Sequence, residues 1–239
     1  DSNYSEGTTV PLLAEAEPGG LFINWTGDVG TIADVNDPST TIVMNDDYSI
    51  TANFRGGVLM ELELGEGWNI FSTPIALDPC CDTWGEFVTL GDGLDYQSAY
   101  YWDGSIFQLV DADYPLTPCD AIYVKMNSED TVPIIANPGI TGLPSKEVVE
   151  GWNLVGSAFI NGTGTMAVDE ALISLYYAPG ELLPWGYTQV VSPAMNQPGW
   201  VYIRDGADPP DMLVGKGVWV SMDNADTYTG FTYTPWPGP

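Results

Sequence analysis

The sequence predicts an all-β protein in which two tandem copies of one β-rich unit follow a small N-terminal module. The segment Glu66–Ser72 (EGWNIFS) recurs 84 positions later (152 minus 68, Trp to Trp) as Glu150–Ser157 (EGWNLVGS). Downstream, Ala121–Met126 (AIYVKM) is matched by Gly217–Met222 (GVWVSM). Similar segments in a fixed order indicate a structural unit used twice. Short runs of alternating apolar and polar residues between Gly and Pro turns are typical of strands.

Residues 1–55 form the first predicted domain, and their pattern is β throughout. Val10 and Leu12 lie on one side of an alternating run, and an acidic turn, Asn45–Asp47, separates two apolar segments. The strands expected after the first run are Leu21–Trp25, Thr40–Met44 and Ser49–Phe54.

Three segments of this module, Glu6–Val10 (EGTTV), Phe22–Asp28 (FINWTGD) and Met44–Phe54 (MNDDYSITANF), are similar to the divergent internalin B-repeat family of bacterial and archaeal surface proteins. The resemblance implies a small β-grasp-like module that acts as a spacer or adhesive stalk. Family members usually carry one more strand before the first of these segments, so the resemblance implies an open slot beside Val10 and Leu12. Either the chain is a trimmed or short variant, or a strand from another copy fills the slot.

The predicted repeats span residues 58–142 and 143–234. Each begins with a strand that carries the Gly-Trp-Asn motif, and we expect Trp68 and Trp152 to anchor the core. Aromatic pairs at Tyr100-Tyr101 and Tyr176-Tyr177 strengthen the match. The other expected elements are a helix at Thr83–Leu90 capped by Asp82, a helix at Met166–Leu175 capped by Thr165, hairpins at Asp103-Gly104 and Pro179-Gly180, closing strands at Ile122–Met126 and Val218–Met222, and final strands at Val132–Ala136 and Tyr228–Tyr233.

The second copy also resembles a repeat of surface proteins from anaerobic bacteria and archaea, because Gly215–Val220 (GKGVWV) closes it as in that repeat. The first copy departs there with Pro118–Val124 (PCDAIYV). The resemblance implies a surface location and a structural or adhesive role, without an assigned catalytic activity.

The charge of the chain excludes some partners. With 33 Asp and Glu against 5 Lys and Arg, the formal net charge is -28, which repels nucleic acid and anionic lipid. The acids either form a solvated surface or bind Ca²⁺, whose ligands are oxygen atoms. The candidate calcium ligands lie in three acidic loops: Asp92 and Asp95; Asp111 and Asp113; Asp205, Asp208 and Asp211.

The cysteine and sequon positions give candidate disulfide and glycosylation sites, in line with the surface location that the resemblance implies. A disulfide from Cys80 or Cys81 to Cys119 would close a loop of about 40 residues, and the alternative is a three-cysteine metal site. Glycosylation sequons begin at Asn3, Asn24 and Asn161. The chain has no run of 18 apolar residues, so we expect no membrane insertion.

We expect no enzymatic activity. The chain has no histidine, and no phosphate loop, nucleophile elbow or dinucleotide fingerprint appears. Pairs of carboxylates occur, but 33 acids produce such pairs by chance. The tryptophans expected in loops, which could stack on surface glycans, are Trp102, Trp185, Trp200 and Trp236.

The Pro-rich tail, residues 235–239, is either a frayed end or an arm that docks on a neighbour, with Tyr233 and Trp236 as contact residues. Taken together, the sequence predicts a secreted cell-surface structural protein that associates with other copies of itself in a filament, stalk or layer. The alternative is a monomeric adhesin or carbohydrate-binding module.

Overall fold

The computed structural model describes residues 4–15, 20–90, 93–137, 142–160, 163–175, 186–204 and 208–231. The chain divides into two compact units, Asp1–Val58 and Leu59–Pro239. In the described residues nearly all regular structure is antiparallel strand, with two α-helices of four residues each, so the predicted all-β class is confirmed.

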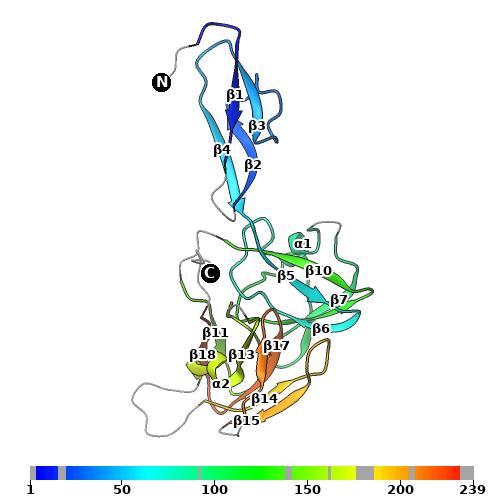
Figure 1. The fold of residues 1–239 in the computed structure, drawn as a ribbon. Coiled ribbons are helices and arrows are strands. Elements are labelled where there is room, and N and C mark those ends of the chain that lie inside the picture. The colour runs from blue at the N-terminus through cyan, green and yellow to red at the C-terminus, as the bar shows by residue number, and fades with distance from the viewer. Residues whose placement is uncertain are drawn as a thin grey trace. The chain divides into compact units, whose positions relative to one another are not determined.

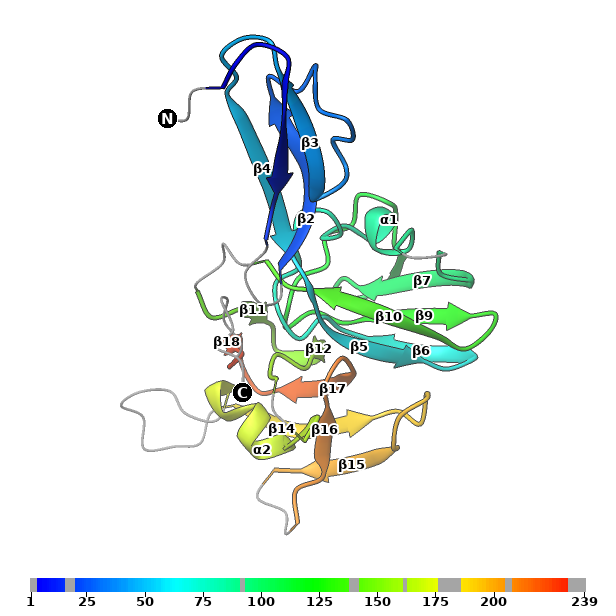
Figure 2. The ribbon, with the colours of Figure 1, turned by 45° about the horizontal axis from the view of Figure 1, so that its top comes forward.

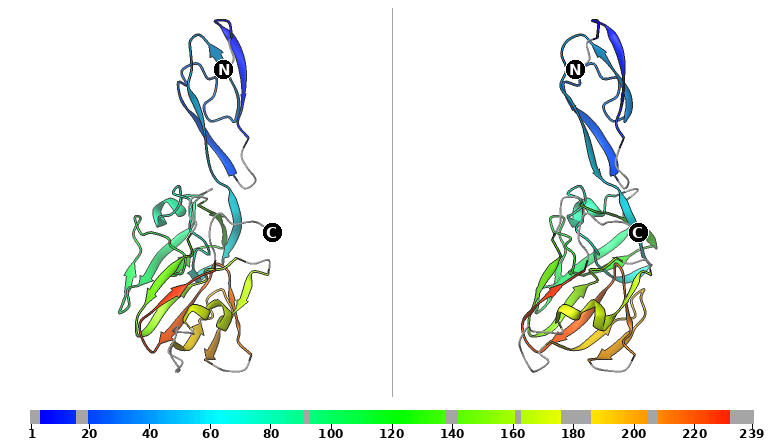
Figure 3. Two further views of the ribbon diagram at one scale, coloured as in Figure 1. Left: turned by 90° about the vertical axis from the view of Figure 1, so that its left-hand side faces the viewer. Right: turned by 60° about the vertical axis from the view of Figure 1, so that its left-hand side comes forward.

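The first unit consists of two antiparallel pairs of strands. Both views in Figure 3 show these strands side by side, along the long dimension of the unit. The indole nitrogen of Trp25 donates a hydrogen bond to the Asp37 carbonyl at 3.0 Å and anchors the long connection between the second and third strands. Gly27 has φ +95°, and a Cβ there would lie 2.2 Å from the Ser49 carbonyl oxygen, so only glycine fits. The strands are β1 (Thr8–Leu13), which pairs with β3 (Ser39–Met44), and β2 (Gly20–Gly27), which pairs with β4 (Ile50–Gly56).

The second unit contains both repeats, and their elements follow the same order (Figure 1). Each repeat has one four-stranded sheet with the same topology, β6-β9-β7-β8 in the first copy and β12-β17-β14-β15 in the second. Each copy also pairs its first strand with its last, β5 with β10 and β11 with β18.

The first copy comprises β5 (Val58–Leu64), β6 (Gly67–Phe71), α1 (Trp84–Phe87), β7 (Tyr96–Trp102), β8 (Phe107–Leu109), β9 (Ile122–Met126) and β10 (Asp130–Ile135). The second comprises β11 (Ser145–Val148), β12 (Gly151–Gly156), β13 (Thr165–Ala167), α2 (Val168–Ala171), a 3₁₀ turn η1 (Ile173–Leu175), β14 (Tyr187–Ser192), β15 (Trp200–Ile203), β16 (Asp211–Leu213), β17 (Gly217–Met222) and β18 (Asp226–Thr229).

The asparagine explains why the Gly-Trp-Asn motif opens each sheet. The Asn69 side chain is buried, and its amide donates to the carbonyls of Gly65 and Gly67 while its oxygen accepts from the Gly65 N–H. Asn153 makes the equivalent three bonds in the second copy. The motif glycine has a positive φ in both copies, +85° at Gly67 and +91° at Gly151. The motif therefore clamps a tight turn before the strand.

The prediction that the motif tryptophans lie in the core is wrong. Trp68 is 36% exposed and Trp152 is 42% exposed. Side chains alternate along a strand, so a buried Asn69 turns Trp68 to the opposite face. The large buried indole of the first copy belongs instead to Trp84, which stacks on Phe87 in α1.

Two local predictions for the second copy also need correction. Thr165–Ala167 form a strand paired with β16 and not the start of a helix, although Val168, Leu172 and Leu175 are buried together as expected. The equivalent hairpin joins β14 to β15 through residues 193–199. The predicted turn at Pro179-Gly180 and the pair Tyr176-Tyr177 lie outside the described residues.

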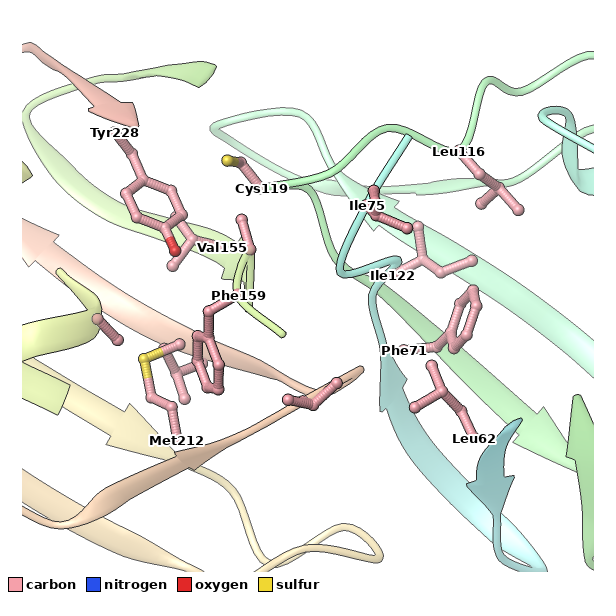
Figure 4. Close-up of a cluster of buried hydrophobic side chains, with 14 of the residues drawn as sticks. Leu62, Phe71, Ile75, Leu116, Cys119, Ile122, Val155, Phe159, Met212 and Tyr228 are labelled. Carbon is pink, nitrogen blue, oxygen red and sulfur yellow. The ribbon is translucent and has the colours of Figure 1, made fainter. Parts of the chain in front are cut away.

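The two copies share one hydrophobic core, and Figure 4 shows side chains that both copies contribute to it. Phe71 and Ile122 come from the first copy, and Val155, Phe159 and Met212 come from the second. Close backbone contact supports this packing, because the Gly156 N–H donates to the Cys119 carbonyl at 2.9 Å. Lys146 of the second copy forms an ion pair with Asp120 of the first and donates to the Leu154 carbonyl at 2.9 Å.

Cys119 does not form the expected disulfide with Cys80 or Cys81. The Sγ atoms of Cys80 and Cys81 lie 3.2 Å apart, whereas Cys119 is fully buried where the copies meet and lies toward Val155 and Tyr228 (Figure 4). Burial raises the pKa of the Cys119 thiol to about 12, and the neighbouring Asp120 carboxylate adds to the shift. The thiol serves here as a small apolar side chain of the core.

Candidate functional site: an aromatic groove

The sheet of the first copy carries an unusual number of aromatic side chains on the face opposite its hydrophobic core. Directly paired residues point to the same side of a sheet, and the register pairs Trp68 with Lys125, Tyr100 with Tyr123, and Trp102 with Phe107. Figure 2 shows the strands that carry most of them, β6, β9 and β7, within the first copy. These side chains therefore share one face.

Part of this face forms an open groove of about 460 Å³ with mainly apolar walls, lined by Trp68, Tyr100, Phe107, Tyr123 and Met195. The Trp68 ring centroid lies 6.1 Å from that of Tyr100 and 6.3 Å from that of Tyr123. Phe107 packs edge-on against Tyr123 at 5.2 Å and is 46% exposed. A contiguous, partly exposed patch of aromatic rings is a candidate interaction site.

The second copy supports the floor of the groove. The Trp219 indole N–H donates to the Tyr123 hydroxyl at 2.7 Å, and the Trp102 indole N–H donates to the Trp152 carbonyl at 3.2 Å. Burial raises the pKa of Tyr123, and the hydrogen bond from Trp219 partly offsets this shift. The Tyr123 ring is thereby held from behind, which preorganises the aromatic wall.

A loop of the second copy completes the groove. Asn196 adopts φ +52° and donates through its amide to the carbonyls of Glu66 and Trp68, at 3.0 and 3.1 Å. A Cβ on Gly65 would lie 2.6 Å from the Asn196 side chain, so glycine makes room for this contact. Asn196 thus holds the loop against β6, and the neighbouring Met195 lines the groove. Neither copy forms this site alone.

The lining residues are suited to stacking and hydrogen bonding. None of the five carries a carboxylate, thiol or imidazole, the groups that most often act as acids, bases or nucleophiles. One cation adjoins the groove. The Lys125 ammonium lies over the Trp68 ring, 5.8 Å from the ring centroid. The groove can stack on flat apolar faces and offer tyrosine hydroxyls and a lysine to polar groups.

The sequence pointed to acidic loops as metal sites, but the structure does not gather them. In the described part of the chain no three acidic or cysteine side chains are placed to hold one ion. Asp95 instead accepts hydrogen bonds from Asn127 and Ser128. Asp111 and Asp113 are exposed, Asp208 precedes β16, and Asp211 is the first residue of β16. Asp92 and Asp205 lie outside the described residues, and calcium binding stays a prediction.

The remaining predicted sites are distributed over the first unit and the ends of the chain. Asn24 lies on β2, and its side-chain oxygen accepts from the Asn53 amide at 2.9 Å. Val10 and Leu12 are half-buried on β1. The predicted sites that lie outside the described residues are Asn3, Asn161, Trp185, Tyr233 and Trp236.

Sequence reasoning missed the groove because it assigned Trp68 to the core and treated Tyr100 and Tyr123 only as repeat markers. A usable signal was present: if Asn69 and Phe71 point inward, Trp68 must point outward.

Among the described residues, no helix has the length and apolar character needed to span a membrane.

Comparisons with known proteins bear on the first unit. Residues 1–57 match the family model of the divergent InlB B-repeat domain. Neither the search of curated proteins nor the search of solved structures found a match. The matched segment covers the first unit and leaves the groove outside it. Residues 1–57 are therefore similar to a repeat of bacterial surface-associated proteins.

Proposed function

We propose that the protein is a non-enzymatic, surface-associated adhesin whose second unit binds carbohydrate in the aromatic groove. The observation that carries this proposal is the adjoining, partly exposed set of Trp68, Tyr100, Phe107 and Tyr123. The first unit, with its similarity to the InlB B-repeat domain, is the spacer or attachment module.

Sugars fit the groove because a pyranose ring has an apolar C–H face and polar edges. The C–H face packs on an aromatic ring, and the sugar hydroxyls bond to polar groups of the groove, such as tyrosine hydroxyls. Nucleic-acid bases also stack on aromatic rings. A formal charge of -28, however, opposes a phosphate backbone, and among the described residues only Lys125 is placed over the Trp68 ring. Carbohydrate is therefore the better match.

The test compares two equivalent tryptophans. Trp68→Ala removes a groove wall, whereas Trp152→Ala removes the matching motif residue of the second copy, which is equally exposed but does not line the groove. We expect Trp68→Ala to weaken binding of neutral oligosaccharides from a glycan array by roughly 30-fold, since a central aromatic anchor contributes about 2 kcal/mol. Calorimetry measures the affinity. No binding by the unaltered protein, or equal losses in both variants, would count against the proposal.

Self-association is a second candidate function, favoured by the first unit. In its described residues β1 pairs only with β3, and β2 only with β4, so each ladder has two strands. Leu13 on β1 is 66% exposed. Addition of a strand from a second copy beside Val10 and Leu12 would cover this edge and build a filament or layer, as unpaired strand edges favour.

Light scattering and electron microscopy on the full chain test this second candidate. Leu13→Lys should dissolve any polymer without unfolding the unit, because the side chain is exposed. Ile106→Lys, at an equally exposed position of the second unit, is the control. A monodisperse particle for the unaltered protein excludes the polymer.

A further inference from the structure

We infer that the groove selects a saccharide that carries a carboxylate, a uronic acid unit, and that Lys125 pairs with this carboxylate. The inference rests on the proposed function, because it names the ligand class of the same groove. It follows from the position of Lys125 and from the contacts that the other described cationic side chains make.

Lys125 is positioned by the sheet register. It lies on β9 directly opposite Trp68 on one side and Ser98 on the other, so all three side chains point to the groove face. Its ammonium stays 5.8 Å from the Trp68 ring centroid. A sugar bound in the groove against Trp68 would therefore have its substituents within reach of this charge, which lies over the Trp68 ring.

The other described cationic side chains already bind oxygen atoms of the protein, whereas the contact described for Lys125 is with the Trp68 ring. Lys146 pairs with Asp120, and Lys216 donates to the Glu63 carbonyl at 2.8 Å. Arg204 donates to the Tyr187 carbonyl at 3.5 Å and lies over the Tyr187 ring. Among the described residues Lys125 has no acidic partner within ion-pair distance, although the chain contains 33 acids. An unpaired ammonium beside an apolar groove is complementary to an anionic group on the ligand.

Internal symmetry supports a role in the site. In the second copy the register pairs Trp152 with Ser221, so Ser221 occupies the position equivalent to Lys125. The lysine is therefore a difference between the copies and is not part of the framework that they share. It occurs in the copy whose motif tryptophan lines the groove.

The net charge limits the ligand to a short acidic saccharide. At -28 the protein repels a long polyanion, but screening limits this repulsion to about 8 Å at physiological salt, so one carboxylate next to Lys125 gains locally. The groove, at about 460 Å³, is in the range of small-ligand sites, roughly 300–1,000 Å³.

The experiment compares uronic acid oligosaccharides with their own methyl esters, which keep the ring and the linkage but lose the charge. Galacturonic and glucuronic acid trimers and their esters serve as probes in calorimetry with the full chain. We expect the acid form of at least one trimer to bind about five-fold more tightly than its ester at low salt, and this preference to shrink as salt is added.

The variants assign the preference to one side chain. Lys125→Gln should remove the preference, so that the acid and its ester bind with equal affinity, whereas Lys125→Arg should keep it. The double variant Lys125→Gln/Ser221→Lys keeps the net charge and places the lysine at the equivalent position of the second copy, so it should not restore the preference.

The outcomes separate this inference from the proposed function. Binding of neutral oligosaccharides and esters that depends on Trp68, without any preference for the acid form, overturns the inference and leaves the adhesin proposal intact. A preference that persists in Lys125→Gln also overturns it. Failure of every saccharide to bind overturns both.

Discussion

Replacement of Gly156 by alanine tests how closely the two copies pack. A Cβ at this position would lie 1.9 Å from the Ser72 Oγ and 2.2 Å from the Asp120 carbonyl oxygen. The serine hydroxyl can rotate, but the carbonyl cannot, because the Gly156 N–H holds the adjacent Cys119 carbonyl at 2.9 Å. The backbone of one copy must therefore move away from the other.

Overpacking of a core costs typically 1–3 kcal/mol, and a displaced backbone puts Gly156→Ala near the upper end, about 3 kcal/mol. For a unit of this size, 1 kcal/mol lowers the Tm by roughly 2–4 °C, so we expect a decrease of about 6–12 °C. Tryptophan fluorescence follows this transition selectively, because Trp25 is the only one of nine tryptophans that precedes Leu59.

Gly142→Ala is the matched control. No atom lies within 4 Å of the Cβ that it would add, and its φ is not positive, so the Tm should change by less than about 2 °C. If both variants melt at the same temperature, the close contact of the two copies at Gly156 is refuted, and with it the shared core.

Two further predictions concern the groove loop and the buried thiol. Asn196→Ala removes the hydrogen bonds to the Glu66 and Trp68 carbonyls and places alanine at a positive φ, so it should weaken saccharide binding several-fold and lower the Tm by a few degrees; an unchanged affinity would mean that the loop does not shape the groove. Because the pKa of Cys119 is raised from 9.0 to about 12, its contribution to stability is complete below pH 9 and is lost as the pH rises to about 12. Denaturant unfolding at pH 8.5 and 10 should show a steeper loss of stability for the unaltered protein than for Cys119→Ala, by up to about 1.4 kcal/mol per pH unit, and equal slopes would contradict the burial.

Elements with a clear local period were predictable. The closing strand Ile122–Met126 has the predicted bounds, and Val168, Leu172 and Leu175 are buried together as their spacing indicates. In these segments only one face is apolar enough to be buried, so a single orientation satisfies the hydrophobic effect.

Orientation was not predictable where both faces of a strand carry apolar residues. In β6, Trp68 and Ile70 lie on one face and Asn69 and Phe71 on the other, so period alone does not decide which face turns to the core. The Asn69 clamp decides it, because its hydrogen bonds require a buried amide next to Gly65. Similarly, Thr165–Ala167 form a strand because β16 is available as a partner.

The sequence by itself determined the β class, the two copies and their order of elements, because alternation and repetition are local properties of the chain. Only the tertiary structure decided the site. The groove needs Trp68 and Tyr123 from the first copy and Met195 from the second, and the register of separate strands brings Lys125 beside Trp68. Such contacts depend on how the two repeats pack through a shared core. The spacing of residues along the chain does not predict this packing.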